Sequence, residues 1–225
     1  MIPYAQLRKE PRLPLADAIP LPAPLTVYVE PTNRCNLSCD FCPQSLPDYK
    51  ERAGYWEHMD IDLYRKVITE IGELGIKSLK LYFFGEPLLH PQIGQICFLA
   101  HQVCERVELT TNGMALTVKV VMDILGCVDY LRVSIYRDIK HPEHVIRNVE
   151  RLWDLRAGLR HEKPFIFIKV LNEEDRVWAE ARYSSISDEI NIEGLHTIGS
   201  EFVQISQQVH GSQIACPYPF YNLVV

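Results

Sequence analysis

Three cysteines lie within eight residues of one another, at Cys35, Cys39 and Cys42, with the spacing C-x3-C-x2-C. Three thiolates this close on an irregular loop can converge on one soft metal centre. A structural zinc ion would need a fourth ligand, and the nearest histidine, His58, lies 16 residues beyond Cys42. An iron–sulfur cluster normally takes four thiolates, so three would leave one iron open to bind a small molecule. Three incidental thiols are the remaining interpretation, although an exposed polar loop is a poor place for them.

The elements that position these cysteines follow from the hydrophobic pattern. Short β-rich runs predict strands, and apolar residues at helical spacing predict helices, some with a capping residue such as Asp60 or Thr117. The expected strands cover residues 26–30, 78–84, 107–111, 130–135, 165–171 and 189–192. The expected helices cover residues 61–74, 91–104, 117–125, 142–157 and 175–183. Strand and helix thus alternate about six times, which is typical of βαβ units and a parallel sheet.

The right-handed crossover rule leaves a barrel, a partial barrel or an open doubly wound sheet for such a chain. In these architectures the chemistry lies at the carboxyl ends of the strands. The distinctive residues follow this rule, because the cysteines come after the first expected strand and Gly85-Glu86-Pro87 after the second. Thr111-Asn112-Gly113 follows the third strand, and Ser134 ends the fourth. Four such features at one edge of the sheet predict a common site.

Residues 30–43, EPTNRCNLSCDFCP, resemble the cluster loop of the radical S-adenosylmethionine (radical SAM) enzymes. That family has the same cysteine spacing and an aromatic residue before the last cysteine, which Phe41 matches. The resemblance implies that Cys35, Cys39 and Cys42 hold a [4Fe-4S] cluster, whose fourth iron is chelated by the methionine moiety of S-adenosylmethionine. It further implies that one-electron reduction cleaves the sulfonium and releases a 5′-deoxyadenosyl radical, which abstracts hydrogen from a substrate. An electron donor such as flavodoxin or ferredoxin is an implied partner.

Other segments resemble motifs that contact S-adenosylmethionine in this family. Phe84-Gly85-Glu86-Pro87 resembles the Gly-Gly-Glu motif, with Phe84 in place of the first glycine. Gly85 would allow close backbone approach, and Glu86 would accept a bond from the methionine ammonium. A charge at a helix N-terminus is the alternative role for Glu86. Segments around Asn112 and Ser134 resemble those that contact the cofactor or shape its pocket. The implied cofactor-binding residues are Phe41, Gly85, Glu86, Pro87, Asn112 and Ser134.

For several further residues the sequence leaves the role or the orientation of the side chain open. Tyr136 departs from the family pattern, because many relatives have an aspartate at that position. Lys169, inside an otherwise apolar strand, could point into a barrel or extend along its edge. Cys97 and Cys104 share one face of an apolar helix and are expected to be buried, inert thiols, whereas Cys127 could be inert or a hydrogen-atom donor.

The resemblance covers about residues 25–192 and implies the short, partial (β/α)6 barrel of the radical SAM family. Six of the 15 prolines fall at or before Pro24, so residues 1–24 are expected to form an extended arm before a core at 25–200. Residues 201–225 include Cys216-Pro217, which resembles the start of the C-terminal extension of the SPASM/twitch branch, without its later cysteines. We therefore expect a truncated member or a form that lost its auxiliary domain. Truncation would leave the terminal apolar run as an unpaired strand edge.

Composition narrows the class of protein. The chain has 225 residues, of which 47% are hydrophobic, and this suits one folded domain with at most a small appendage. A net charge of -6 argues against a broad nucleic-acid surface. No apolar run reaches the length of a membrane span, and the N-terminus does not resemble a secretory signal. Seven cysteines without such a signal favour a reducing, cytoplasmic location.

Three functions are compatible with these residues. The leading hypothesis is a radical SAM oxidoreductase or modifying enzyme that abstracts hydrogen from a small molecule, such as a sugar or aminocyclitol, or from a peptide. The second is a catalytically degenerate or truncated module that binds the cluster and S-adenosylmethionine without turnover, and Phe84, Tyr136 and the short tail motivate it. The third is a zinc-stabilised structural domain. No membrane partner is expected.

Overall fold

The computed structural model describes residues 21–53, 56–136, 142–193 and 222–224. Residues 1–20 of the expected arm, and residues 194–221 with Cys216, lie outside these described residues. The described residues form one parallel sheet of seven strands in the order β6-β5-β4-β3-β2-β1-β7. This sheet does not close, which confirms the partial barrel of the radical SAM type. Its strands are β1 Thr26–Tyr28, β2 Ser78–Leu81, β3 Arg106–Thr111, β4 Tyr130–Ser134, β5 Phe165–Val170, β6 Glu189–Ile192 and β7 Asn222–Val224.

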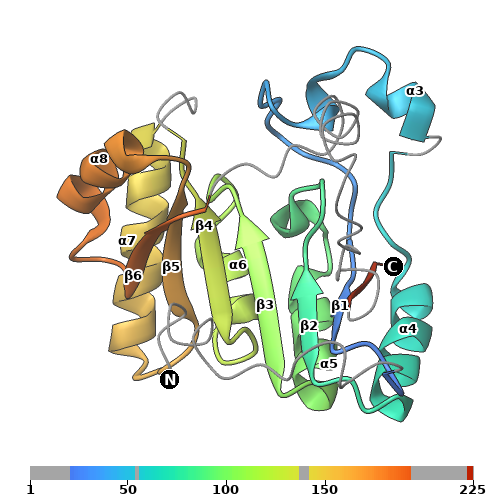
Figure 1. The fold of residues 1–225 in the computed structure, drawn as a ribbon. Helices are drawn as coiled ribbons and strands as arrows, with labels where there is room; N and C mark the ends of the chain where they lie inside the picture. The colour runs from blue at the N-terminus through green and yellow to red at the C-terminus, as the bar shows by residue number, and fades with distance from the viewer. Residues whose placement is uncertain (1–20, 54–55, 137–141, 194–221, 225) are drawn as a thin grey trace, which may run out of the picture.

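The helices alternate with the strands as the sequence predicts, and Figure 1 shows α5, α6 and α7 behind the sheet. Asp60 caps α4 by accepting bonds from the backbone N–H groups of Asp62 and Leu63, at 2.9 and 3.1 Å. No helix of the described residues is long and apolar enough to cross a membrane. The helices are α3 Tyr49–Ala53, α4 Ile61–Glu73, α5 Ile93–Val103, α6 Val118–Ile124, α7 Pro142–Gly158 and α8 Glu173–Tyr183, with 3-10 helices η1 Pro43–Ser45 and η2 Pro87–Leu89.

The two faces of the sheet differ in chemistry. On the strands, Lys80, Glu108 and Arg132 alternate with apolar residues and therefore lie on the face opposite the core. A salt bridge joins Lys80 to Glu108 at 3.8 Å, and another joins Arg132 to Glu193 at 3.3 Å. Lys169 lies on the same face, in agreement with the interior-pointing alternative. The alternate strand residues are buried in the core: Leu79, Leu81, Val107, Leu109, Leu131, Val133, Ile166 and Ile168.

The second strand and the end of the chain differ most from the sequence-based expectation. The second strand ends at Leu81 instead of residue 84, because the backbone N–H groups of Phe84 and Gly85 donate to the carboxylate of Glu30. For the end of the chain the sequence predicts an unpaired strand edge, and in the structure residues 222–224 lie at the edge of the sheet with one side paired. Residues 222–224 form β7, which pairs in parallel with β1 and satisfies backbone groups on one of its sides.

The carboxyl ends of the strands meet at the upper edge of the sheet in Figure 1. The loop that follows β1, which carries the three cysteines, stands above this edge together with α3. The loops after β2, β3 and β4 begin at the same edge, as parallel pairing requires. The sheet therefore brings the sequence motifs that follow its first four strands to one end of the molecule.

Candidate functional site

The cysteine loop is fastened to the loop after β2 by hydrogen bonds. Glu30, just beyond β1, accepts bonds at Oε1 from the backbone N–H groups of Phe84 (2.6 Å) and Gly85 (2.7 Å). The N–H of Glu86 donates to the carbonyl oxygen of Arg34 at 2.8 Å. Burial raises the pKa of Glu30, while the two N–H donors act in the opposite direction. The two loops therefore form one unit at the carboxyl edge of the sheet.

Gly85 makes the closest approach between these loops. A Cβ added at Gly85 would stand 1.8 Å from the carbonyl oxygen of Thr32 and 3.0 Å from the Cα of Asn33. Any side chain at this position would displace the backbone of the cysteine loop. The sequence predicts close backbone approach at Gly85, and the structure identifies the approaching group as the cysteine loop itself.

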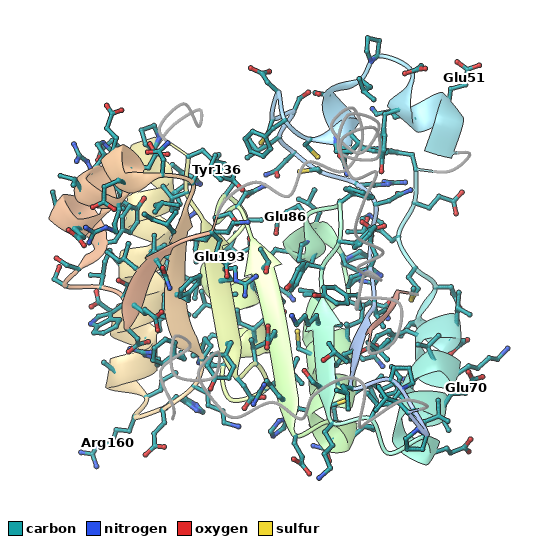
Figure 2. The ribbon with its side chains drawn as sticks, viewed as in Figure 1. Glu51, Glu70, Glu86, Tyr136, Arg160 and Glu193 are labelled. Atoms are coloured by element: carbon teal, nitrogen blue, oxygen red, sulfur yellow. The ribbon has the colours of Figure 1, made fainter. Side chains whose placement is uncertain are left out.

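Glu86, labelled near the upper edge of the sheet in Figure 2, is 2% exposed, and its carboxylate joins the start of η2 to the end of β3. Its Oε1 accepts bonds from Leu88 N (3.1 Å) and Thr111 Oγ1 (2.7 Å), and its Oε2 accepts from Asn112 N (2.7 Å). Burial raises the pKa of Glu86 to about 7, although the three donors act in the opposite direction. Glu86 therefore caps η2, which begins at Pro87, as the helix N-terminal alternative expects. Its contact with an ammonium group stays a prediction, for which Oε2 keeps a second lone pair.

Asn112 connects the end of β3 to the cysteine loop. Its Nδ2 donates to Asn36 Oδ1 at 2.7 Å and to Cys35 Sγ at 3.9 Å. Its Oδ1 accepts a bond from Met114 N at 2.9 Å, which fixes the orientation of the amide. Asn112 thus lies at the predicted site, where it contacts one of the three clustered cysteines directly.

The three clustered cysteines are free, half-buried thiols. Burial raises the pKa of all three, and the neighbouring thiols Cys42 and Cys35 help to raise the pKa of Cys39 to about 11. Within the described residues, no group of three or more Cys, His, Asp or Glu side chains is arranged to hold a single metal ion. A [4Fe-4S] cluster makes a different demand, because each thiolate binds its own iron. Three soft thiolates on one loop fit such a cluster and leave its fourth iron open for another ligand.

A cavity of about 970 Å³ opens beside the cysteines. Ligand-binding cavities commonly have volumes of about 300 to 1,000 Å³. The cysteine loop forms one wall, and Lys50 and Trp56 form part of another, with the Lys50 ammonium 4.5 Å from the centre of the Trp56 ring. Residues at the N-terminal end of α8 form a further wall. The lining residues are Cys35, Asn36, Leu37, Ser38, Cys39, Asp40, Phe41, Gln44, Lys50, Trp56, Tyr136, Leu171, Asn172, Glu174 and Asp175.

An aromatic pair closes the space between the cysteine loop and β4. The Phe41 and Tyr136 rings meet edge to face, with centroids 4.9 Å apart, and both line the cavity. Burial raises the pKa of Tyr136 to about 12, while a side-chain hydrogen bond with Ser134 acts in the opposite direction. The side chain of Ser134 therefore forms a hydrogen bond with Tyr136, which stands where many members of the family have an aspartate. Phe41 keeps 41% of its surface exposed, which leaves its ring available to a ligand.

Two functional residues were missed by the sequence analysis. Glu30 lies inside the cysteine motif, and its acidic side chain at a strand end was a usable signal. Gln44 had no such signal. Its Nε2 donates to the carbonyl oxygens of Asn33 (3.0 Å) and Phe84 (2.9 Å), while its Oε1 is buried without a hydrogen-bond partner. An orphaned acceptor in a residue that lines the cavity fits a site that awaits a ligand with N–H or O–H donors.

Other residues considered from the sequence lie away from the cavity. His58 packs edge to face on His90, with centroids 5.3 Å apart, and is not among the residues that line the cavity. Cys97 and Cys104 are buried in the core, as expected, and burial raises the pKa of both thiols. Cys127 is half-buried and likewise does not line the cavity.

Comparison with known proteins identifies the family. The model of the radical SAM superfamily matches residues 29–154, which is more than half of the chain. The chain belongs to the radical SAM superfamily. Members of this superfamily bind a [4Fe-4S] cluster and S-adenosylmethionine, the two cofactors that the cysteine loop implies. The relatives also bear out the resemblance to SPASM-type members.

Curated relatives match this radical SAM chain over part of their length. A PqqA peptide cyclase of Ruegeria pomeroyi is 29% identical over 122 residues, which cover 53% of this chain and 31% of the relative. A GTP 3′,8-cyclase of Synechocystis is 25% identical over 155 residues, which cover 64% of this chain and 46% of the relative. The chain thus spans about a third to a half of these relatives.

Solved structures share the fold. SuiB of Streptococcus suis has a TM-score of 0.62 at 13% identity, covering 94% of this chain and 51% of that one. BtrN in complex with AdoMet and 2-DOIA has a TM-score of 0.51 at 24% identity, covering 64% of this chain and 56% of that one. At these identities the structures establish the radical SAM fold of this chain.

Proposed function

We propose that this chain is a radical SAM enzyme, in which Cys35, Cys39 and Cys42 hold a [4Fe-4S] cluster beside the 970 Å³ cavity. The observation that carries the proposal is that the three free, half-buried thiols of the family motif lie on one loop, and that two of them, Cys35 and Cys39, line one wall of that cavity. When bound, the cluster and S-adenosylmethionine supply a one-electron cleavage that ends in abstraction of hydrogen from a substrate. A flavodoxin or ferredoxin is the proposed electron donor.

The remaining site residues position and enclose the cofactors. Gly85 keeps the loop after β2 against the cysteine loop, Pro87 begins η2, and Glu86 offers Oε2 to the ammonium of S-adenosylmethionine. Asn112 and Ser134, at the carboxyl ends of β3 and β4, hold Cys35 and Tyr136, two residues that line the cavity. Phe41 presents its ring to the nucleoside part of the cofactor. Among these residues Phe41 lines the cavity, and the roles of the others rest on the family resemblance and on their contacts with the loops that form its walls.

The substrate we propose is a polar small molecule or a peptide. The cavity carries charge on opposite walls, with Lys50 on one side and Glu174 and Asp175 on the other. A ligand with both charged and polar groups suits such walls better than an apolar one, because its charges can complement those of the walls. One relative is a peptide cyclase and another is a GTP cyclase, which span the same two substrate classes. The six described cysteines are all free thiols, which supports the proposed cytoplasmic location.

The test is anaerobic reconstitution of the full chain with iron and sulfide. About four irons per chain are expected, together with 5′-deoxyadenosine after addition of dithionite and S-adenosylmethionine. Cys39→Ala should abolish both. Cys127→Ala removes a half-buried thiol outside the cavity and should retain both.

Two outcomes would contradict the proposal. A full cluster without 5′-deoxyadenosine would identify the chain as a binding module. Colourless protein with one zinc ion and no iron would identify a structural zinc domain.

A further inference from the structure

Asn112 lies between a cluster ligand and a buried carboxylate. Its Nδ2 donates to Cys35 Sγ at 3.9 Å, while its backbone N–H donates to Glu86 Oε2 at 2.7 Å. Asn112 is 8% exposed, so water does not readily replace either bond. The two contacts come from one residue at the end of β3, which is 77 positions from Cys35 in the sequence.

We propose that Asn112 sets the electron affinity of the cluster through its hydrogen bond to Cys35, and this inference rests on the proposed function. An N–H group directed at a ligand sulfur stabilises negative charge on that sulfur, and therefore favours the reduced cluster. Partners of metal ligands commonly tune a centre in this way. Asn112 is thus a positioning residue rather than a cofactor contact alone.

The donor of Asn112 is held in place before any cofactor arrives. Its Oδ1 accepts the N–H of Met114, so that Nδ2 must face Asn36 and Cys35. The turn beneath it is supported by Asn148 of α7, whose Nδ2 donates to the carbonyl oxygens of Gly113 (2.9 Å) and Met114 (3.2 Å). A donor with a fixed direction needs little reorganisation when charge develops on the sulfur.

The backbone of the cysteine loop supplies a second donor to the same sulfur. The N–H of Leu37 donates to Cys35 Sγ at 3.4 Å. That bond belongs to the loop and persists when residue 112 changes. The contribution of Asn112 comes from a different strand and can be removed by itself, which makes the inference testable.

The experiment compares Asn112→Leu with Asn148→Leu in the reconstituted full chain. Leucine has the same side-chain branching as asparagine and is somewhat larger, so it removes the donor without leaving space for water. Asn148→Leu is the matched control, because it removes an amide that supports the same turn and makes no contact with a cysteine. The readout is a potentiometric titration of the cluster, followed by electron paramagnetic resonance.

In Asn112→Leu, the ratio of reduced to oxidised cluster at a fixed potential should fall about tenfold, a shift of ~59 mV to lower potential for one electron. In Asn148→Leu the ratio should change less than about twofold, because the Asn112 amide remains and is still oriented by the N–H of Met114. An unchanged ratio in Asn112→Leu, or an equal fall in both variants, would overturn the inference. Either result would leave the proposed function standing, because iron content and 5′-deoxyadenosine formation of the unaltered chain test that separately.

A second measurement needs no variant and covers the case in which Asn112→Leu fails to fold. The reduced cluster of the unaltered chain, labelled with nitrogen-15 in asparagine side chains, is examined by pulsed electron paramagnetic resonance without S-adenosylmethionine. The N–H···S bond from Asn112 should produce a coupling to an asparagine amide nitrogen. Absence of that coupling in protein with a full cluster would refute the bond.

Discussion

Gly85 donates its backbone N–H to Oε1 of Glu30 at 2.7 Å, across a separation of 55 residues. The same oxygen accepts the N–H of Phe84 at 2.6 Å. A carboxylate that accepts two backbone N–H groups makes strong, charge-assisted bonds. This single oxygen therefore directs the chain after β2 beneath the cysteine loop, and two loops from adjacent strands become one platform for the candidate cluster.

Gly85→Ala should disrupt this platform. The added Cβ would stand 1.8 Å from the carbonyl oxygen of Thr32, so the cysteine loop must move. Forced overpacking of this kind costs about 1–3 kcal/mol or more. We expect a lower thermal midpoint and incomplete iron loading after reconstitution. Gly158→Ala is the control, since a Cβ there meets nothing within 4 Å, and it should leave both measurements unchanged.

Glu30→Ala should weaken the same contact from the other side. The change leaves the N–H groups of Phe84 and Gly85 without their acceptor, at a cost of about 1–3 kcal/mol for each buried group. Glu30→Gln retains an oxygen acceptor and should recover part of the loss. Urea denaturation of the cluster-free proteins measures the free energy of unfolding. If the Ala and Gln variants were equally stable, the bond to this oxygen would not be the cause.

Glu86 predicts a pH dependence of stability. Burial raises its pKa from 4.5 to about 7, so folding favours the protonated carboxyl. The resulting stability is fully present below pH 4.5 and is lost as the pH rises through about 7. A shift of this size corresponds to about 3 kcal/mol.

Glu86→Gln is the control for this pH dependence, because it cannot titrate. Relative to that variant, the unfolding free energy of the cluster-free wild-type chain should fall by about 3 kcal/mol between about pH 4.5 and about pH 8. Denaturation curves across this range measure the difference. Parallel pH profiles of the two proteins would show that the carboxyl titrates normally.

Tyr136 should protect the cluster from solvent. Tyr136→Phe keeps the edge-to-face contact with Phe41 and removes only the hydrogen bond with Ser134, at a cost of about 1 kcal/mol. Tyr136→Ala also removes the ring, and the reconstituted protein should lose its visible cluster absorbance several-fold faster in air. Phe98→Ala removes a 53%-exposed ring on α5 and should bleach at the unaltered rate. If the unaltered chain and the three variants lost their cluster absorbance at equal rates, the Tyr136 ring would not protect the cluster.

Much of the site could be predicted because it depends on local patterns. The spacing of Cys35, Cys39 and Cys42 identifies a soft-metal loop without any knowledge of the fold. Alternation of strands and helices predicts a parallel sheet, and a parallel sheet places Gly85, Glu86 and Asn112 at one edge. Each of these inferences uses residues that are close in the sequence.

What the sequence determined by itself was the chemistry of the cysteine loop, the α/β architecture and the edge at which the motifs meet. The tertiary structure alone decided that Glu86 is buried against Thr111 and Asn112, and that Tyr136 reaches Phe41. It also decided the roles of Glu30 and Gln44. These contacts join different strands and loops, so they depend on strand register and crossover paths. Local residue patterns do not specify those long-range distances, because many registers bury the same apolar face.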